Sequence, residues 1–137
     1  MTDFLSAIAI AAKGLRAQAG RMRLISENIA NADTTPTRPG EAPYRRKIAV
    51  FDKRFDQELQ ATAPAIGRTR RDSAPFPLRH EPGHPAADAA GNVAKANVDL
   101  LIEGMDMREA QRSYEANVNV IAATRRMIQR TLDLMRS

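Results

Sequence analysis

The chain lacks cysteine and tryptophan, and aromatic residues make up only 4% of its 137 residues. The absence of cysteine excludes disulfides, thiolate metal sites and a cysteine nucleophile. Few large side chains are left to anchor a globular core. No apolar run reaches the roughly 18 residues that a membrane-spanning helix needs, so we expect no direct membrane span. The start of the chain carries Asp3 and a periodic apolar pattern instead of a basic stretch and an unbroken apolar run, so we expect no cleaved signal peptide.

Proline is missing from both ends of the chain, because all eight prolines fall between Pro36 and Pro85. In each proline-free end a side-chain pattern repeats every seven residues, which is typical of a coiled-coil seam. We expect the two seams to face each other, as the core of an intramolecular helical hairpin with apolar surface left over for other subunits. The residues expected to pack there are Ile8, Leu15, Met22, Ile25 and Ile29 from the first end, and Met107, Tyr114, Val118, Ile121, Ile128 and Leu132 from the second.

The periodic patterns give the bounds of two long helices. The first is expected from Thr2 to about Asn31, because a proline that follows closely pushes the chain out of the α region. The second is expected from about Val98 to Met135. The predicted fold is therefore mainly α, with long N- and C-terminal helices paired as a coiled coil. Its three parts are an N-terminal helix (residues 1–33), a small β-rich and loop segment (34–96) and a C-terminal helix (97–137).

The segment between the helices is rich in turn-forming and basic residues. Residues 44–51 alternate well enough to form one strand, and shorter strands are predicted at 75–79 and 91–93. Residues 60–74 have the composition of a flexible loop. The whole segment holds too few apolar residues to be stable without support from the helices.

Two residues, Asn97 and Asp99, are candidates for the N-cap of the second helix. Charges are sorted along this helix. Acidic residues are frequent in its first half and arginines in its second. This order complements the helix dipole. It would also let the acidic half of one helix lie beside the basic half of a staggered neighbour, and both interpretations can hold together.

Three blocks of sequence resemble the flagellar axial protein family. Residues 26–34 are similar to the S-x-N-I-A-N-x-x-T signature shared by rod, hook and hook-junction proteins, and residues 97–117 to the N-V-D…A-x-R-x-Y-E-A-N helix of that family. Residues 81–88, together with 43–47, are similar to a short proximal rod member. The residues that match the two motifs are Ser26, Asn28, Ile29, Ala30, Asn31, Thr34, Asn97, Val98, Asp99, Arg112, Tyr114, Ala116 and Asn117.

The resemblance implies a structural subunit of the proximal rod in the flagellar basal body, with no enzymatic activity. Members of this family are made in the cytoplasm, exported unfolded through the flagellar type III apparatus without a cleaved signal peptide, and assembled in the periplasm. It further implies helical assembly through the paired terminal helices into a torque-transmitting shaft around the export channel. The implied partners are copies of the chain itself, other rod proteins and the export apparatus. A second short proximal rod protein is the nearest alternative, and residues 84–88 argue against it.

Polar residues beside the seams have two interpretations. Asn28 and Asn117 could fix the register of the helices or bond to another subunit, as a buried asparagine does in coiled coils. Asn31 could do the same or cap the end of its helix.

Basic clusters in the middle segment also leave alternatives open. Arg45, Arg46 and Lys47 could contact neighbouring subunits, and a solvated loop or phosphate contacts are the other interpretations. A basic coiled-coil nucleic-acid-binding protein is thus the rival function. No recognised nucleic-acid module is present, so we expect no nucleic-acid partner.

Two histidines lie four residues apart, at His80 and His84. Pro82 lies between them, so they do not share a helical face, and no further set of ligands accompanies them. No nucleophile elbow and no phosphate-binding glycine loop occurs either. We therefore expect no metal, no cofactor and no active site.

Overall fold

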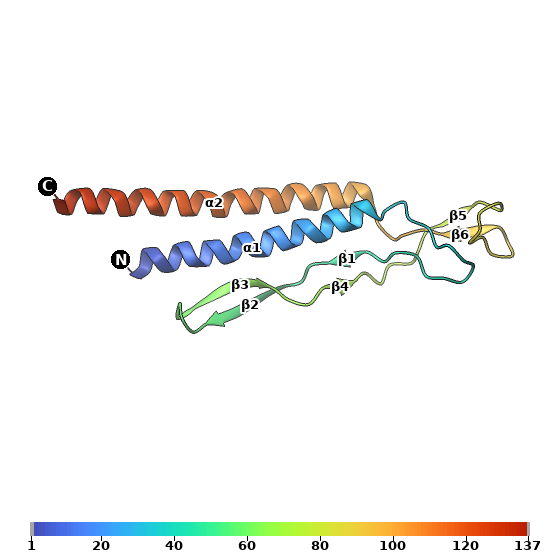
Figure 1. Ribbon diagram of the computed structural model, residues 1–137, viewed down its shortest axis with the longest axis horizontal. Coiled ribbons are helices and arrows are strands. Elements are labelled where there is room, and N and C mark those ends of the chain that lie inside the picture. Colours follow the sequence, from blue (N-terminus) through green and yellow to red (C-terminus); the bar gives the residue numbers. More distant parts are fainter. Residues whose placement is uncertain (1, 137) are drawn as a thin grey trace.

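The computed structural model describes residues 2–136. Two long helices lie side by side and run in opposite directions, so that both ends of the chain lie at the same end of the molecule (Figure 1). They are α1 (Thr2–Ala30) and α2 (Leu100–Arg136). Short antiparallel strands occupy the segment between them. The prediction of two terminal helices with a small β-containing middle is confirmed.

Side chains define the ends of the helices that meet at this middle segment. At the end of α1, Asn31 Nδ2 donates to the carbonyl of Glu27 at 2.8 Å. At the start of α2, Asp99 Oδ1 accepts the backbone N–H of Leu101 at 2.8 Å. Asp99 is therefore the N-cap of α2, which leaves Asn97 free for another role.

Three two-stranded antiparallel ladders form the middle segment. The β2–β3 hairpin folds back along α1, whereas β5 and β6 extend beyond the joined ends of the helices (Figure 1). The pairs are β1 (Lys47–Ile48) with β4 (Arg70–Arg71), β2 (Phe51–Asp56) with β3 (Ala61–Ile66), and β5 (Leu78–His80) with β6 (Asn92–Ala94).

Two predictions for this segment are wrong in detail. The stretch 44–51 is not one strand, because only Lys47–Ile48 pairs there and β2 begins at Phe51. The expected loop 60–74 contains β3 and β4. Strand β3 consists mostly of small residues without an alternating pattern, so its conformation depends on its partner strand and on α1.

Small residues attach the β2–β3 hairpin to α1. Ala17 on the helix and Ala63 on β3 are 4% and 3% exposed. A Cβ atom at Gly20 would overlap the end of the Ile66 side chain, so the glycine provides the space into which Ile66 packs. Lys13 forms an ion pair with Asp56 at the far end of the hairpin. The middle segment is thus supported by the first helix, as its low apolar content requires.

Candidate functional site

The most buried residues of α2 follow a line that the sequence pattern did not single out. Glu103, Ala110 and Thr124 are 0%, 0% and 6% exposed, and all lie on one seven-residue repeat. Asn117 belongs to the same repeat, and its Oδ1 would lie 2.7 Å from a Cβ placed on Gly14. The middle of the helix contact is therefore made of small and polar groups, which lets the two helices approach closely.

None of the packing residues predicted for α2 belongs to this repeat. Ile25 is buried at 5% exposure, whereas Ile29, Tyr114 and Val118 are 39%, 36% and 42% exposed. Their part in contacts between subunits stays a prediction. The remaining members are half-buried, namely Ile8, Leu15, Met22, Met107, Ile121, Ile128 and Leu132.

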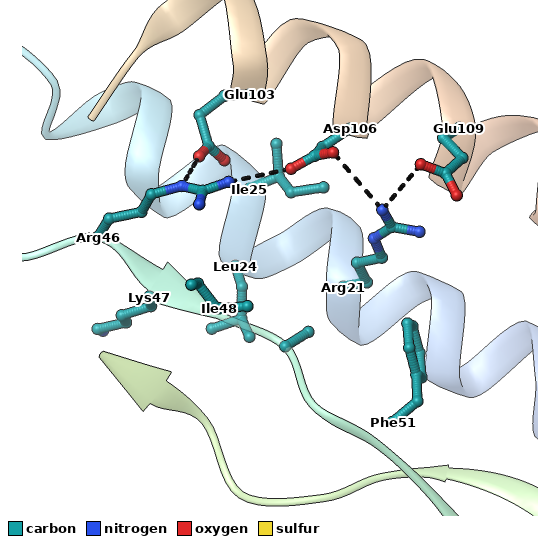
Figure 2. Close-up of a pocket in the computed structure, with 11 residues that line it drawn as sticks. Arg21, Leu24, Ile25, Arg46, Lys47, Ile48, Phe51, Glu103, Asp106 and Glu109 are labelled. Atoms are coloured by element: carbon teal, nitrogen blue, oxygen red, sulfur yellow. Dashed lines mark hydrogen bonds and ion pairs between the residues drawn. The ribbon is translucent and has the colours of Figure 1, made fainter. Parts of the chain in front are cut away.

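A buried polar junction joins the middle segment to both helices at the end where they meet. Its central residue is Glu103, in the first turns of α2, which accepts hydrogen bonds from Arg46 Nε and, at 3.1 Å, from Asn28 Nδ2. Figure 2 shows the Arg46 guanidinium between the carboxylates of Glu103 and Asp106. A fully buried carboxylate requires such partners, because burying an unpaired charge is costly.

Asn28 attaches the strand β1 to α1. Its side chain is 1% exposed. Nδ2 donates to the carbonyl of Lys47 at 2.8 Å, and Oδ1 accepts the N–H of the same residue at 3.0 Å. Oδ1 also accepts the Tyr44 hydroxyl at 2.9 Å. The amide thus pairs with the backbone as a neighbouring strand would, so here Asn28 acts within the chain.

Arg46 is shared among three carboxylates. Besides Glu103, its guanidinium donates to Asp106 at 3.0 Å and to Asp72 at 3.3 Å. Burial alone would lower the pKa of Arg46, but the hydrogen bond and the charge of Glu103 outweigh it and raise the pKa. The pKa of Asp72 is lowered, mainly by the hydrogen bond from the Ala74 N–H and also by the hydrogen bond and charge of Arg46. Both groups are therefore held in their charged forms.

Arg21 extends the polar junction along the helix pair. Its guanidinium lies 3.3 Å from Glu109 and 3.8 Å from Asp106, and 5.9 Å from the ring centre of Phe51. The charged residues that line the cleft between them are all held in ion pairs, and the rest of its lining is apolar (Figure 2). Among residues 2–136, the one buried side-chain atom without a partner is Gln18 Oε1, which lies outside this cleft. These ion pairs hold α1, α2 and the segment before β1 in fixed positions relative to one another.

The three basic residues predicted to contact neighbours all bond within the chain. Arg45 donates to the carbonyl of Asp72 at 2.7 Å and lies over the ring of Phe76 at 4.2 Å. Lys47 Nζ lies 2.9 Å from Glu27, and that hydrogen bond raises the pKa of Lys47. Arg46 occupies the polar junction. A contact of these residues with another subunit stays a prediction.

The two family motifs meet at the polar junction through one residue each. Asn28 comes from the first motif, and Asn97 from the second accepts the N–H of Arg46 at 2.7 Å. Apart from Asn117, which lies in the helix contact, most other members lie at helix ends or on the surface, among them exposed Ser26, Ala30, Arg112 and Ala116. The sequence did not identify Glu103, Asp106 and Asp72 as members: the first two were visible only as acids in the first half of the second helix, and Asp72 only as part of the expected loop 60–74. Asn117 Nδ2 bonds to the carbonyl of Ser113 at 2.9 Å, inside its own helix.

The histidines hold the β5–β6 end of the chain in place. His84 Nδ1 accepts the N–H of Ala86 at 3.0 Å, and its Nε2 lies 3.1 Å from Thr35 Oγ1. His80 Nδ1 lies 3.3 Å from Asn92 Oδ1. The part of the chain that the structure describes contains no cluster of three metal-ligating side chains. No helix in that part is long and apolar enough to cross a membrane.

Comparison with known families matches both ends of the chain. Residues 8–36 match the family described as "Flagella basal body rod protein". Residues 89–134 match "Flagellar basal body rod FlgEFG protein C-terminal". These two ranges contain most of both helices and include Asn28, Asn97 and Glu103 of the polar junction.

Whole-chain relatives carry the name flagellar basal-body rod protein FlgC. The one from Agrobacterium fabrum is 42% identical over 137 residues, which are 100% of this chain and 99% of the relative. The one from Escherichia coli O6:H1 is 38% identical over 91% of this chain and 92% of its own length. The one from Bacillus subtilis is 36% identical over 98% and 99% of the two chains. With matches over the full length and at both helices, the chain belongs to the FlgC family of flagellar basal-body rod proteins, whose role is structural and not enzymatic.

Proposed function

We propose that the chain is a structural subunit of the proximal rod, where its helix pair forms part of the torque-transmitting shaft around the export channel. The observation that carries this proposal is the large apolar surface that α2 leaves uncovered. Leu101, Met105 and Met127 are 74%, 63% and 47% exposed. Such a surface on a chain this small indicates contacts with other protein surfaces.

The helix pair suits a mechanical role. The seven-residue repeat of Glu103, Ala110, Asn117 and Thr124 against α1 supports coiled-coil pairing of the terminal helices. The polar junction adds a cross-link of charged hydrogen bonds between α1, α2 and β1, so these elements would move as one body under load.

The β2–β3 hairpin is suited to lateral contacts. Phe51 and Phe55 are 43% and 61% exposed, although the chain has few aromatic residues. Aromatic side chains are enriched in protein interfaces, where they bury large areas at low entropic cost. We expect this hairpin to touch a neighbouring subunit.

The partners we propose are copies of the chain and the other rod proteins FlgB, FlgF, FlgG and FliE. The chain would be made in the cytoplasm and passed to the periplasm by the flagellar type III export apparatus without cleavage of a signal peptide. Its marginal middle segment and its lack of cysteine support threading in an unfolded state.

Purified basal bodies test the proposal directly. After washing with detergent and salt, mass spectrometry should find the chain in a fixed ratio to the other rod proteins. A chain that washes away completely from intact basal bodies would refute the proposal, and salt-sensitive DNA retention would then favour the nucleic-acid alternative.

A further inference from the structure

His84 joins two segments that lie far apart in the sequence. Its Nδ1 accepts the backbone N–H of Ala86 at 3.0 Å, and its Nε2 lies 3.1 Å from Thr35 Oγ1. Thr35 belongs to the loop that follows α1, and Ala86 lies in the turn that leads into β6. The turn also closes on itself, because the N–H of Ala87 donates to the carbonyl of His84 at 3.0 Å. The imidazole therefore connects the end of the first helix with the β5–β6 tip (residues 78–94).

Only the neutral form of His84 fits both contacts. A ring nitrogen that accepts a hydrogen bond carries no proton, so the proton of the neutral ring is on Nε2, which donates to Thr35. Protonation would place a second donor on Nδ1, directly opposite the N–H of Ala86. Two donors cannot bond to each other, so the charged ring would have to leave this position. Histidine is the ordinary side chain whose charge changes between about pH 5 and pH 8.

The surroundings of His84 do not compensate for a positive charge. Among residues 2–136, no carboxylate forms an ion pair with its ring. Arg38, on the loop that carries Thr35, is itself a cation. The acids of the two joined segments have other partners, namely Asp33 with Lys95, Glu81 with Arg79, Glu41 with Thr37, and Asp88 with the N–H groups of Ala90 and Asn92. Protonation would therefore break a hydrogen bond without gaining an ion pair.

His80, the second histidine of the tip, makes a contact that tolerates protonation. Its Nδ1 lies 3.3 Å from Asn92 Oδ1, which can only accept, so Nδ1 already carries a proton. Acid would add a proton to Nε2 and leave this hydrogen bond in place. The two histidines should therefore respond differently to acid, although they lie only four residues apart.

We propose that His84 is a pH-sensitive clamp between the loop after α1 and the β5–β6 tip. In its neutral form it holds the turn at residues 84–87 against Thr35, and in its protonated form it releases this turn. The tip extends beyond the joined ends of the helices, where all three residues of β5 are exposed (Figure 1). Acid would thus change the surface that the chain presents at this end. The inference concerns the chain by itself and goes beyond the proposed function.

Amide hydrogen exchange of the full-length chain, followed by NMR, tests the clamp. Exchange would be measured at about pH 7.5 and about pH 5, which span the titration of an ordinary histidine. Protection factors are compared, because they correct for the effect of pH on the intrinsic exchange rate and report local opening. The lower pH stays above the range in which Asp72 loses its charge, since the pKa of Asp72 is lowered from 3.8.

The amide of Ala86 should respond to pH, whereas a neighbouring amide should not. The protection factor of the Ala86 N–H should fall about tenfold at the lower pH, because its acceptor is lost. The N–H of Lys95 donates to the carbonyl of Pro77 at 2.9 Å, beside the tip and away from both histidines. Its protection factor should stay within about twofold.

Two matched variants assign the effect to His84. Asparagine carries an acceptor oxygen in the place of Nδ1 and does not titrate, so His84→Asn should protect the Ala86 amide equally at both pH values. His80→Asn should show the same fall as the wild-type chain. Circular dichroism at both pH values should show unchanged helix content in all three chains, so that any loss of protection is local.

Three results would overturn the inference. They are an Ala86 amide without protection at the higher pH, equal protection of the wild-type chain at both pH values, and a loss of protection that persists in His84→Asn. The first would show that the turn is not held, and the other two that His84 does not control it.

Discussion

Replacing Glu103 by alanine should destabilise the junction of the two helices far more than replacing any exposed acid on α2. Glu103 is 0% exposed and accepts hydrogen bonds from Arg46 and Asn28. Breaking a buried ion pair from one side costs about 3–5 kcal/mol, because the remaining charge stays buried without its partner. Arg46 keeps Asp106 and Asp72, so we expect the lower end of that range, about 3 kcal/mol of unfolding free energy.

Tyrosine fluorescence can report on this junction, since no tryptophan emission overlaps with it. The chain has no tryptophan and two tyrosines, and the Tyr44 hydroxyl donates to Asn28. In a Tyr114→Phe background, urea unfolding followed through Tyr44 should show a midpoint about 1–2 M lower for Glu103→Ala, given the usual dependence of unfolding free energy on urea. Glu103→Gln keeps the shape of the side chain and one hydrogen-bond acceptor, so its urea midpoint should fall by roughly half as much as that of Glu103→Ala.

Glu109→Gln is the matched control on the same helix. The Glu109 side chain is 67% exposed, so its pair with Arg21 is screened by solvent and should contribute less than about 1 kcal/mol. If Glu103→Ala and Glu109→Gln shifted the midpoint equally, the polar junction would not hold the helices and β1 together, and the reasoning would be wrong.

Three further predictions follow from the helices and the middle segment. Gly104→Ala should raise the unfolding free energy by about 1 kcal/mol, because a Cβ there meets nothing within 4 Å and alanine favours the helix; a lower urea midpoint would contradict this. Gly20→Leu should displace Ile66 and release the β2–β3 hairpin, seen as faster trypsin cleavage at Lys53 and Arg54 in an otherwise helical chain, and unchanged cleavage would count against the packing of Ile66 on α1. The unfolding free energy should fall on acidification, because the pKa of Asp72 in the folded chain is lowered from 3.8. The stabilisation from this carboxylate is complete above pH 3.8 and is lost as the pH falls through the folded-state pKa. Asp72→Asn removes the carboxylate, so its unfolding free energy should depend less on pH below about pH 4.

The helices could be predicted because their signals are local. Long seven-residue repeats without proline give α1 and α2 almost to their ends, and Asp99 was one of two proposed caps. Strand β3 could not be predicted, because residues 61–66 are mostly small and acquire their conformation from Gly20 and the partner strand.

The polar junction could not be predicted from the periodic patterns of the sequence. Asn28 was singled out as a polar residue beside a seam, but its partner Lys47 is 19 residues away in sequence and Glu103 is 75 away. Glu103 resembled any other acid in the first half of its helix. Its burial depends on Arg46 arriving from the middle segment, a long-range contact that no local period predicts. The central line of the helix contact was missed for a similar reason, because its members are small or polar and only Ala110 would count as apolar.

Electron cryomicroscopy of purified basal bodies tests the central claim most directly. We predict density for α1 and α2 inside the proximal rod, side by side, with the polar junction of Asn28, Arg46 and Glu103 intact and the exposed apolar residues of α2 covered by a neighbouring chain. Density that places the chain outside the rod, or that shows its two helices apart, would contradict the claim that the helix pair is a built-in part of the shaft.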